Sequence, residues 1–326
     1  MHRRAFVGGS LALAATPFIL KAAAFAQDAA QAVEPALPVT FTDSSGTEVT
    51  VTDISRIIPL NGDFAEILVT LGLEDKIAAV DISATYPESL KEKPSIGYQL
   101  TIGAEGILQF APTLVIANEF VQPQAVIGQL RDAGVTVVVI QTDNTSIDSP
   151  AEKIRLVAQA VGLADAGEEL ATKVQGELDA AREIIATATD APRVLFLLFQ
   201  QEFQLVGGMG TELDALLPAA GAISAAAEAG IMGFQPLTPE ALVTAAPDII
   251  ITQTAGFEAI GGIDGMLQIP GVAETPAGAN KAFFHYDAQY LLGLGPRTPR
   301  VILELARDFH PELEIELPAI DATPTA

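Results

Sequence analysis

Few residue types in this chain could do chemistry, and tyrosine is the most informative of them. The sequence has no tryptophan and four tyrosines: Tyr86, Tyr98, Tyr286 and Tyr290. Tyr86 and Tyr98 follow an apolar run over 77–80, so we expect both at the carboxyl end of a strand, where α/β sheets bind ligands. A phenolate is a hard anionic ligand that suits Fe(III), and tyrosine is an axial ligand of haem iron in some proteins. From these residues alone, Tyr86 is either an iron ligand or a half-buried tyrosine of an ordinary loop.

Catalytic groups do not form a recognisable arrangement in the sequence. The three histidines are His2, His285 and His310, and no spacing of His, Asp and Glu gives a recognisable zinc-ligand set. The chain has neither a Gly-x-Ser-x-Gly motif nor a phosphate loop that ends in Gly-Lys-Ser/Thr. A hydrolase that uses His285 in a Ser/His/Asp arrangement stays open as an alternative. The sequence predicts a binding protein and not an enzyme.

The charge and the cysteine content narrow the choice of partners. The 326 residues include 17 Lys and Arg against 41 Asp and Glu, for a formal net charge of −24. Such a surface repels phosphate backbones, so we expect no nucleic-acid partner. Cysteine is absent, which excludes disulfides, thiolate metal sites and cysteine nucleophiles. We expect a monomer that binds a small molecule.

Residues 1–26 have the anatomy of a signal peptide. Arg3 and Arg4 precede an uncharged, largely apolar stretch over 5–20, and Ala24 and Ala26 fit an A-x-A cleavage site. The apolar stretch is short for a membrane span, which needs about 20 residues. The paired arginines fit either a twin-arginine signal or the basic region of a general secretory signal. We therefore expect an exported protein.

The rest of the chain alternates between strand-like and helix-like patterns. A β-hairpin is expected over 39–52, around a turn at Asp43-Ser44-Ser45-Gly46. Beyond it, the alternation predicts an α/β fold with mainly parallel sheets covered on both faces. In the first half, the strand candidates are 57–60, 77–80, 114–117 and 135–140, and the helix candidates are 65–71, 104–110 and 125–133.

The second half of the chain repeats the first. Glu105–Ile116 resembles Glu240–Ile251, and each segment combines a short helix, an Ala-Pro break and a buried strand. The chain must turn at these prolines because proline disfavours helical backbone at the residue before it. A weaker match pairs the segment that starts at Arg56 with the one that starts at Arg193. The shared order of these matches predicts two Rossmann-like lobes.

A helical stretch lies between the repeats. Ser149-Pro150 is typical of a helix start, and a long helix is expected from Ala164 to Thr187, after a break at Gly162. The predicted organisation is therefore a signal peptide over 1–26, an N-terminal lobe over 27–148, a linking helix over 149–189, a C-terminal lobe over 190–312 and a flexible tail over 313–326.

The motifs of this chain resemble those of the substrate-binding proteins that serve ABC importers of haem, cobalamin and iron–siderophores. Within that class, the similarity is greatest to the periplasmic hemin-binding proteins, and it covers most of residues 53–310. It is carried by Val80–Asp81, Thr85–Pro87, Gly97–Tyr98, Ala104–Leu108, Gly233–Leu242, Gly261–Gly265, Thr275–Gly278 and Leu292–Thr298. The resemblance implies a periplasmic protein that captures Fe(III)-protoporphyrin IX between two lobes and delivers it to an ABC permease in the inner membrane.

The resemblance also implies roles for individual residues. Tyr86 would be the axial ligand of the haem iron, and Glu105 and Glu240 would dock, one from each lobe, onto arginines of the permease. Many relatives have a basic residue where this chain has Gln99–Thr101, so a propionate anchor would have to come from elsewhere. The other candidates for the haem pocket are Tyr98, Phe234, His285, Tyr290 and Arg297. The second axial ligand stays open among His285, Tyr286, Tyr290 and Met232.

Two other functions compete with this interpretation. A cobalamin or ferric-siderophore binding protein would have the same architecture, although siderophore sites usually contain several Arg or Trp contacts. An exported hydrolase is the alternative from another class. A carrier of free metal ions is disfavoured by the shortage of histidine.

Overall fold

The chain enters its fold through the expected β-hairpin. The computed structural model describes residues 34–200 and 203–317, so the expected signal peptide over 1–26 lies outside the described residues. Strand β1 (Val39–Thr42) pairs antiparallel with β2 (Glu48–Val51). The Asp43 carboxylate accepts hydrogen bonds from the backbone N–H of two turn residues and forms an ion pair with Arg131 at 2.8 Å. The turn is thereby attached to the first half of the fold.

The first half is built on a three-stranded parallel sheet. Strand β4 (Leu114–Ala117) lies between β3 (Ile57–Pro59) and β5 (Thr136–Val139), and every residue of β4 is buried, as in strands covered on both faces. The strand expected over 77–80 is wrong. Its first residue forms an isolated bridge with β3 and its last residue bridges to Ser95, so no ladder forms. The helices of this half are α1 (Gly62–Thr70), α2 (Ala104–Leu108) and α3 (Ala125–Asp132), with 3-10 helices over Glu74–Lys76, Glu88–Glu92 and Gln99–Thr101.

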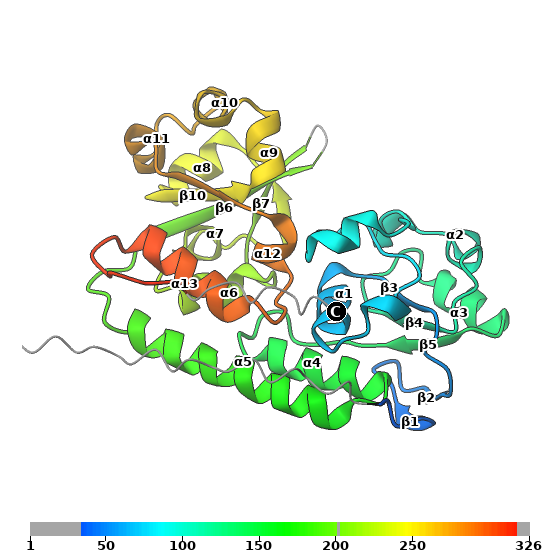
Figure 1. Cartoon of the computed structure of the whole chain (residues 1–326). Helices are drawn as coiled ribbons and strands as arrows, with labels where there is room; N and C mark the ends of the chain where they lie inside the picture. The colour runs from blue at the N-terminus through cyan, green and yellow to red at the C-terminus, as the bar shows by residue number, and fades with distance from the viewer. Residues whose placement is uncertain (1–33, 201–202, 318–326) are drawn as a thin grey trace, which may run out of the picture. The chain divides into compact units, whose positions relative to one another are not determined.

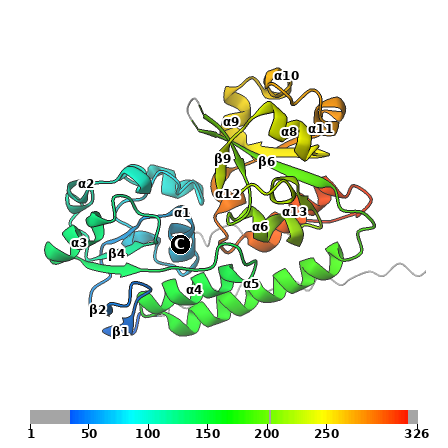
Figure 2. The same cartoon turned by 180° about the vertical axis from the view of Figure 1, so that it is seen from behind.

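The second half contains a mixed six-stranded sheet, of which Figures 1 and 2 label β6, β7, β9 and β10. Its strands are β6 (Arg193–Gln200), β7 (Phe203–Gly207), β8 (Ile223–Ser224), β9 (Phe234–Pro236), β10 (Ile249–Gln253) and β11 (Phe283–Tyr286). Their order is β11-β10-β6-β7-β9, with β8 beside the start of β6. The pairings β6–β10, β10–β11 and β6–β8 are parallel, as expected, whereas the pairings β6–β7 and β7–β9 are antiparallel. The helices are α6 (Leu213–Ala219), α7 (Ala225–Glu228), α8 (Pro239–Ala245), α9 (Thr254–Ala259), α10 (Gly262–Gln268), α11 (Pro276–Asn280), α12 (Ala288–Leu292) and α13 (Thr298–Phe309).

Two helices connect the halves. Helix α4 (Ser149–Ala160) carries Pro150 in its first turn, and α5 (Ala164–Ile185) follows after the break expected at Gly162. The two helices lie side by side (Figure 1). A Cβ atom at Gly167 would lie only 2.2 Å from the Cβ of Ala158, so this glycine permits the close packing of α4 on α5. Helix α5 also contacts α13 of the second half.

The internal repeat is visible in the conformation of both halves. Ala111 and Ala246, the alanines of the two Ala-Pro breaks, have φ angles of 44° and 41°, a left-handed conformation that is uncommon for alanine. The Arg56 guanidinium donates to the carbonyls of Phe110 and Ala111, and the Arg193 guanidinium donates to that of Ala245. In both halves an arginine at the start of a strand thus satisfies carbonyls at the end of the helix before the break.

The largest apolar core extends through both halves and the linking helices. It includes Ile57 and Phe64 from the first half, Leu178 from α5, and Phe196 and Ile302 from the second. The chain expected to form a flexible tail from 313 onward is described as far as Leu317, and Ile315 and Leu317 pack against this core. In the part of the chain that the structure describes, each helix is too short or too polar to span a bilayer.

Candidate functional site

The loop that carries Tyr86 and Tyr98 is organised around Asp81, which is fully buried. The Asp81 carboxylate accepts hydrogen bonds of 2.7 Å from the backbone N–H groups of Ser83 and Gln99. One carboxylate therefore fixes both ends of the segment that contains the two tyrosines. Burial raises the pKa of Asp81, although these hydrogen bonds act in the opposite direction.

Gln289 of helix α12 attaches this loop to the second half of the chain. Its side-chain oxygen accepts hydrogen bonds from the backbone N–H of Thr85 at 2.6 Å and of Tyr86 at 2.9 Å. Its side-chain nitrogen donates to the carbonyl of Gly62 at 2.8 Å and to Glu66 at 3.1 Å. Because Gln289 is buried and bonded through both atoms of its amide, the backbone that carries Tyr86 is held from two sides.

The half-buried ring of Tyr86 is covered by Arg297. The guanidinium carbon lies 3.7 Å from the ring centroid, in cation–π geometry. Two nitrogens of Arg297 donate to the two carboxylate oxygens of Glu66, each at 2.8 Å. A bidentate pair of this kind fixes the plane of the guanidinium. Arg297, a candidate for the haem pocket, therefore lies directly against the proposed iron ligand.

Tyr290 is a second tyrosine that lies beside Arg297. Its ring centroid lies 5.0 Å from the guanidinium carbon of Arg297, and its hydroxyl donates to Glu304 at 2.7 Å. Burial and the neighbouring Glu304 raise the pKa of Tyr290 well above the ordinary tyrosine value. Tyr286 is buried, donates to Asp308 at 2.8 Å and has a pKa that is raised still further. Both hydroxyls thus belong to hydrogen bonds with acids and favour the neutral phenol, which disfavours either as a phenolate ligand.

An exposed apolar surface lies on the loops beside Tyr98. Ile82, Leu100 and Phe120 are exposed by 58%, 39% and 46%, although large apolar side chains are usually buried. Backbone hydrogen bonds from Ile82 to Gly97 and from Gln122 to Gln99 join the loops that carry them. We call these three residues the apolar rim. Sequence reasoning missed Ile82 and Phe120 because single apolar residues in loops form no periodic pattern.

The other sequence-predicted residues are distributed over the second half, with Tyr98 on the first. Tyr98 is half-buried, and burial together with Asp81 and Glu212 raises its pKa. Phe234 is 38% exposed on β9 and contacts Phe196 edge-to-face. His285 stacks on Phe257 with ring centroids 4.5 Å apart and is bonded to Thr254 at 3.1 Å. The structure brings Tyr86, Tyr290 and Arg297 together. His285, by contrast, contacts two residues of α9.

Glu105 and Glu240 occupy equivalent positions in the two halves. Each is exposed in the first turn of the short helix, α2 or α8, that precedes an Ala-Pro break. The macrodipole favours an acid in this turn, so helix stability alone gives a reason for both residues. Their exposure leaves both carboxylates accessible to a partner.

Four buried or partly buried carboxyl groups make the stability of the protein dependent on pH. Burial raises the pKa values of Glu66, Asp81, Glu119 and Glu212 above their ordinary values. A carboxyl group with a raised pKa binds its proton more tightly in the folded than in the unfolded chain. The contribution of such a group is present at acidic pH and is lost as the pH rises through its folded pKa.

We therefore expect the melting temperature to fall as the pH rises from about 5 to about 8, a range above the ordinary carboxyl pKa of ~4. The Glu119→Gln/Glu212→Gln variant should show a shallower fall in thermal melts across this range. Glu169→Gln/Glu183→Gln removes the same charge from exposed positions on α5 and should leave the slope unchanged. A melting temperature of the wild type that rises with pH would contradict the prediction.

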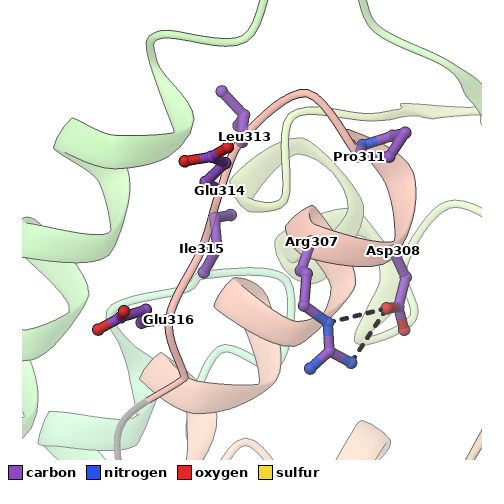
Figure 3. A pocket seen from close by; sticks show the side chains of 7 residues that line it. All are labelled: Arg307, Asp308, Pro311, Leu313, Glu314, Ile315 and Glu316. Carbon is purple, nitrogen blue, oxygen red and sulfur yellow. Dashed lines mark hydrogen bonds and ion pairs between the residues drawn. The ribbon is translucent and has the colours of Figure 1, made fainter.

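A surface cavity of about 570 Å³ lies elsewhere, beside the chain that follows α13 (Figure 3). Its lining includes Arg307, Asp308, Pro311 and Ile315. Arg307 donates from two nitrogens to Asp308 at 3.1 Å, so its charge is already paired. We assign no chemistry to this cavity.

The fold has one larger sheet in each half, connecting helices and a tyrosine-bearing loop fixed between the halves, and it is that of a two-lobed α/β substrate-binding protein. A family model of periplasmic binding proteins matches residues 57–290, and the chain belongs to this family. The periplasmic heme-binding protein RhuT from Roseiflexus sp. RS-1 is 45% identical, with a TM-score of 0.77 over 80% of this chain and 100% of that chain.

Two further proteins support this relationship. The periplasmic heme-binding protein BhuT, solved in complex with two hemes, is 36% identical, with a TM-score of 0.73 over 79% of this chain and 98% of that chain. The ABC transporter substrate-binding lipoprotein YvrC of Bacillus subtilis is 28% identical over 84% of this chain and 86% of that protein.

Proposed function

We propose that this protein captures hemin, Fe(III)-protoporphyrin IX, and delivers it to an ABC permease without changing it chemically. The observation that carries the proposal is the half-buried Tyr86, whose backbone N–H donates to Gln289 and whose ring is covered on one face by Arg297. The similarity to RhuT and BhuT, both heme-binding proteins, supports the same ligand. The cobalamin and siderophore alternatives have no comparable support from this geometry.

Tyr86 is the proposed axial ligand of the iron. Coordination requires the phenolate, and a guanidinium 3.7 Å from the ring stabilises negative charge on it. The Glu66 carboxylate holds Arg297 in place, and Gln289 fixes the backbone. These neighbours would keep the phenol oxygen in one position before the cargo arrives, which lowers the cost of ordering on binding.

The apolar rim is the proposed contact surface for the porphyrin plane. A tetrapyrrole is flat and largely apolar, and ligand sites gain most of their affinity from apolar burial with a few placed polar groups. This source of affinity is required here because the net charge of −24 opposes binding of a dianionic ligand. Tyr98 and Phe234 are further proposed contacts, with His285 and Met232 as candidates for the second axial position.

A spectroscopic titration tests the ligand. Purified protein titrated with hemin should give saturable binding and the charge-transfer absorption of a tyrosinate–Fe(III) complex, and the end point gives the stoichiometry. Cobalamin and ferric siderophores added in excess should not displace the hemin. Preferential binding of either competitor would assign the protein to that ligand, and no saturable binding of hemin would refute the proposal.

Glu105 and Glu240 are the proposed docking residues for the permease. Two exposed ion pairs together contribute on the order of 1–2 kcal/mol, so Glu105→Ala/Glu240→Ala should weaken docking by about tenfold. Hemin uptake into proteoliposomes with the cognate permease should fall accordingly, while hemin binding stays unchanged. Asp132→Ala/Glu274→Ala removes the same charge from exposed positions and should not affect uptake. Equal uptake by the two double variants would contradict the docking role.

The proposed location follows from the same function. A protein that hands a ligand to an inner-membrane importer works on the outer side of that membrane, and the signal-peptide pattern over 1–26 supplies the means of export. The twin-arginine route depends on the two arginines themselves, whereas the general secretory route does not. Replacement of both Arg3 and Arg4 by Lys should block export only if the twin-arginine route is used.

A further inference from the structure

A second cluster of metal-ligating groups lies at the end of α13, among residues to which the proposed hemin function gives no role. His310 caps the C-terminus of α13, Glu312 follows two residues later, and Asp190 lies in the connection between α5 and β6. One ligand atom from each residue lies within 4.8 Å of the other two. The sequence showed no zinc-ligand set because Asp190 lies far from the other two residues in the chain and only the fold brings it close.

The histidine in this cluster is buried and lacks a hydrogen-bond partner. His310 is 0% exposed, and neither ring nitrogen has a hydrogen-bond partner among the described residues. Buried polar groups are otherwise nearly always bonded, so this side chain needs an explanation. A Cβ atom at Gly221 would lie 2.8 Å from its Nε2, so the other edge of the ring is packed against backbone and Nδ1 faces the two carboxylates.

The two distances from His310 Nδ1 are longer than ordinary hydrogen bonds, and they would describe ion pairs only with a protonated imidazole. His310 Nδ1 lies 3.4 Å from an Asp190 oxygen and 3.6 Å from a Glu312 oxygen. An N–H···O hydrogen bond usually measures about 2.7–3.2 Å. Two ligand atoms that each lie about 2.0–2.2 Å from a tetrahedral zinc ion are separated by about 3.3–3.6 Å. The two separations from His310 agree with the second geometry, and the Asp190 and Glu312 oxygens lie within 4.8 Å of each other.

The surroundings favour a cation at this point. The carbonyl groups at the C-terminal end of the 12-residue helix α13 give that end a partial negative charge. The side chains of Asp190 and Glu312 are 77% and 44% exposed, so an ion can enter from solvent. Imidazole and carboxylate are ligands that Zn²⁺ accepts together, with a water molecule in the remaining position.

We propose that Asp190, His310 and Glu312 bind a divalent transition-metal ion, with Zn²⁺ as the best-fitting ion and water in the remaining position. The ion joins the C-terminus of α13 to the connection through which the linking helices enter the second half. The site is independent of hemin, because its residues have no part in the Tyr86 cluster. Its expected effect is on stability, since an ion that binds the folded chain alone raises the free energy of unfolding.

Calorimetric titration of the untagged full chain with Zn²⁺, in the absence of hemin, tests the site. We expect one ion per chain and a melting temperature that rises with Zn²⁺ and returns to its original value with a chelator. Asp190→Asn and Glu312→Gln should each raise the dissociation constant at least about tenfold and abolish the thermal shift. Glu314→Gln, an exposed neighbour in the same segment, is the matched control and should bind as the wild type.

A second measurement reports the ligand geometry. Co²⁺ bound in place of Zn²⁺ should show the intense visible absorption of a four-coordinate ion, and this absorption should be lost in Asp190→Asn. The carboxylate variants are used for this test because the side chains of Asp190 and Glu312 are exposed, so their replacement should leave the fold intact. The proposal is overturned if the wild type binds no Zn²⁺, or if the Asp190→Asn/Glu312→Gln variant binds it as tightly as the wild type.

Discussion

Replacing Tyr86 by Phe is expected to abolish the tyrosinate charge-transfer absorption of the hemin complex and to weaken hemin binding by at least about tenfold, or ~1.4 kcal/mol. The change removes one oxygen and leaves the ring against Arg297, so the loss reports the iron–oxygen bond and not the packing. Absorption spectra and fluorescence quenching during hemin titration measure both effects.

Tyr98→Phe is the matched control for this experiment. Tyr98 lies in the same loop, is half-buried in the same way and would lose the same hydroxyl. Its variant should keep the charge-transfer absorption, with at most a small change in affinity. If Tyr86→Phe retains the spectrum and affinity of the wild type while Tyr98→Phe loses them, the ligand assignment moves to Tyr98. If neither variant changes the spectrum, iron coordination by this loop is wrong.

Replacing Lys153 by Met is expected to lower the free energy of unfolding by about 3–5 kcal/mol. Lys153 of α4 is buried, forms an ion pair with the buried Asp63 of α1 and donates to the carbonyl of Gly293 at 2.9 Å. Methionine fills a similar volume but leaves the Asp63 carboxylate buried without a counter-charge. Denaturant unfolding followed by circular dichroism measures the loss.

The double variant Lys153→Met/Asp63→Leu separates charge burial from packing. Removal of both charges relieves the desolvation cost, so a large part of the lost stability should return. Lys173→Met, at an exposed position on α5, controls for the loss of a positive charge. A double variant that is less stable than Lys153→Met would show that the two residues stabilise the fold through other contacts.

Local pattern was sufficient to predict much of the fold. The β-hairpin follows from its turn residues, strand β4 from its apolar run and the break before α5 from Gly162, and each of these signals acts within a few positions. The run over 77–80 is as apolar as a strand but makes only single bridges, because pairing depends on which segment lies beside it. The antiparallel edge β7–β9 was not predicted for the same reason.

The neighbours of the proposed iron ligand could not be predicted. Tyr86 was identified from its position after an apolar run and from the family resemblance. Gln289 of α12, which fixes the backbone of Tyr86, lies 203 residues from it in sequence. Glu66 of α1, which orients Arg297, lies 231 residues from that arginine. Nothing in the local pattern of a glutamine or a glutamate shows that it will be buried beside a particular loop.

The apolar rim affects how copies of the protein interact with one another when no hemin is bound. In the proposed function, hemin covers Ile82, Leu100 and Phe120. While no hemin is bound, these exposed apolar side chains would favour association between copies of the protein. The excess of acidic groups, 41 against 17 basic ones, makes copies repel one another at the distances where such encounters begin. The negative charge that disfavours an anionic cargo thus also keeps the unloaded carrier in solution, and concentrated salt would remove that protection.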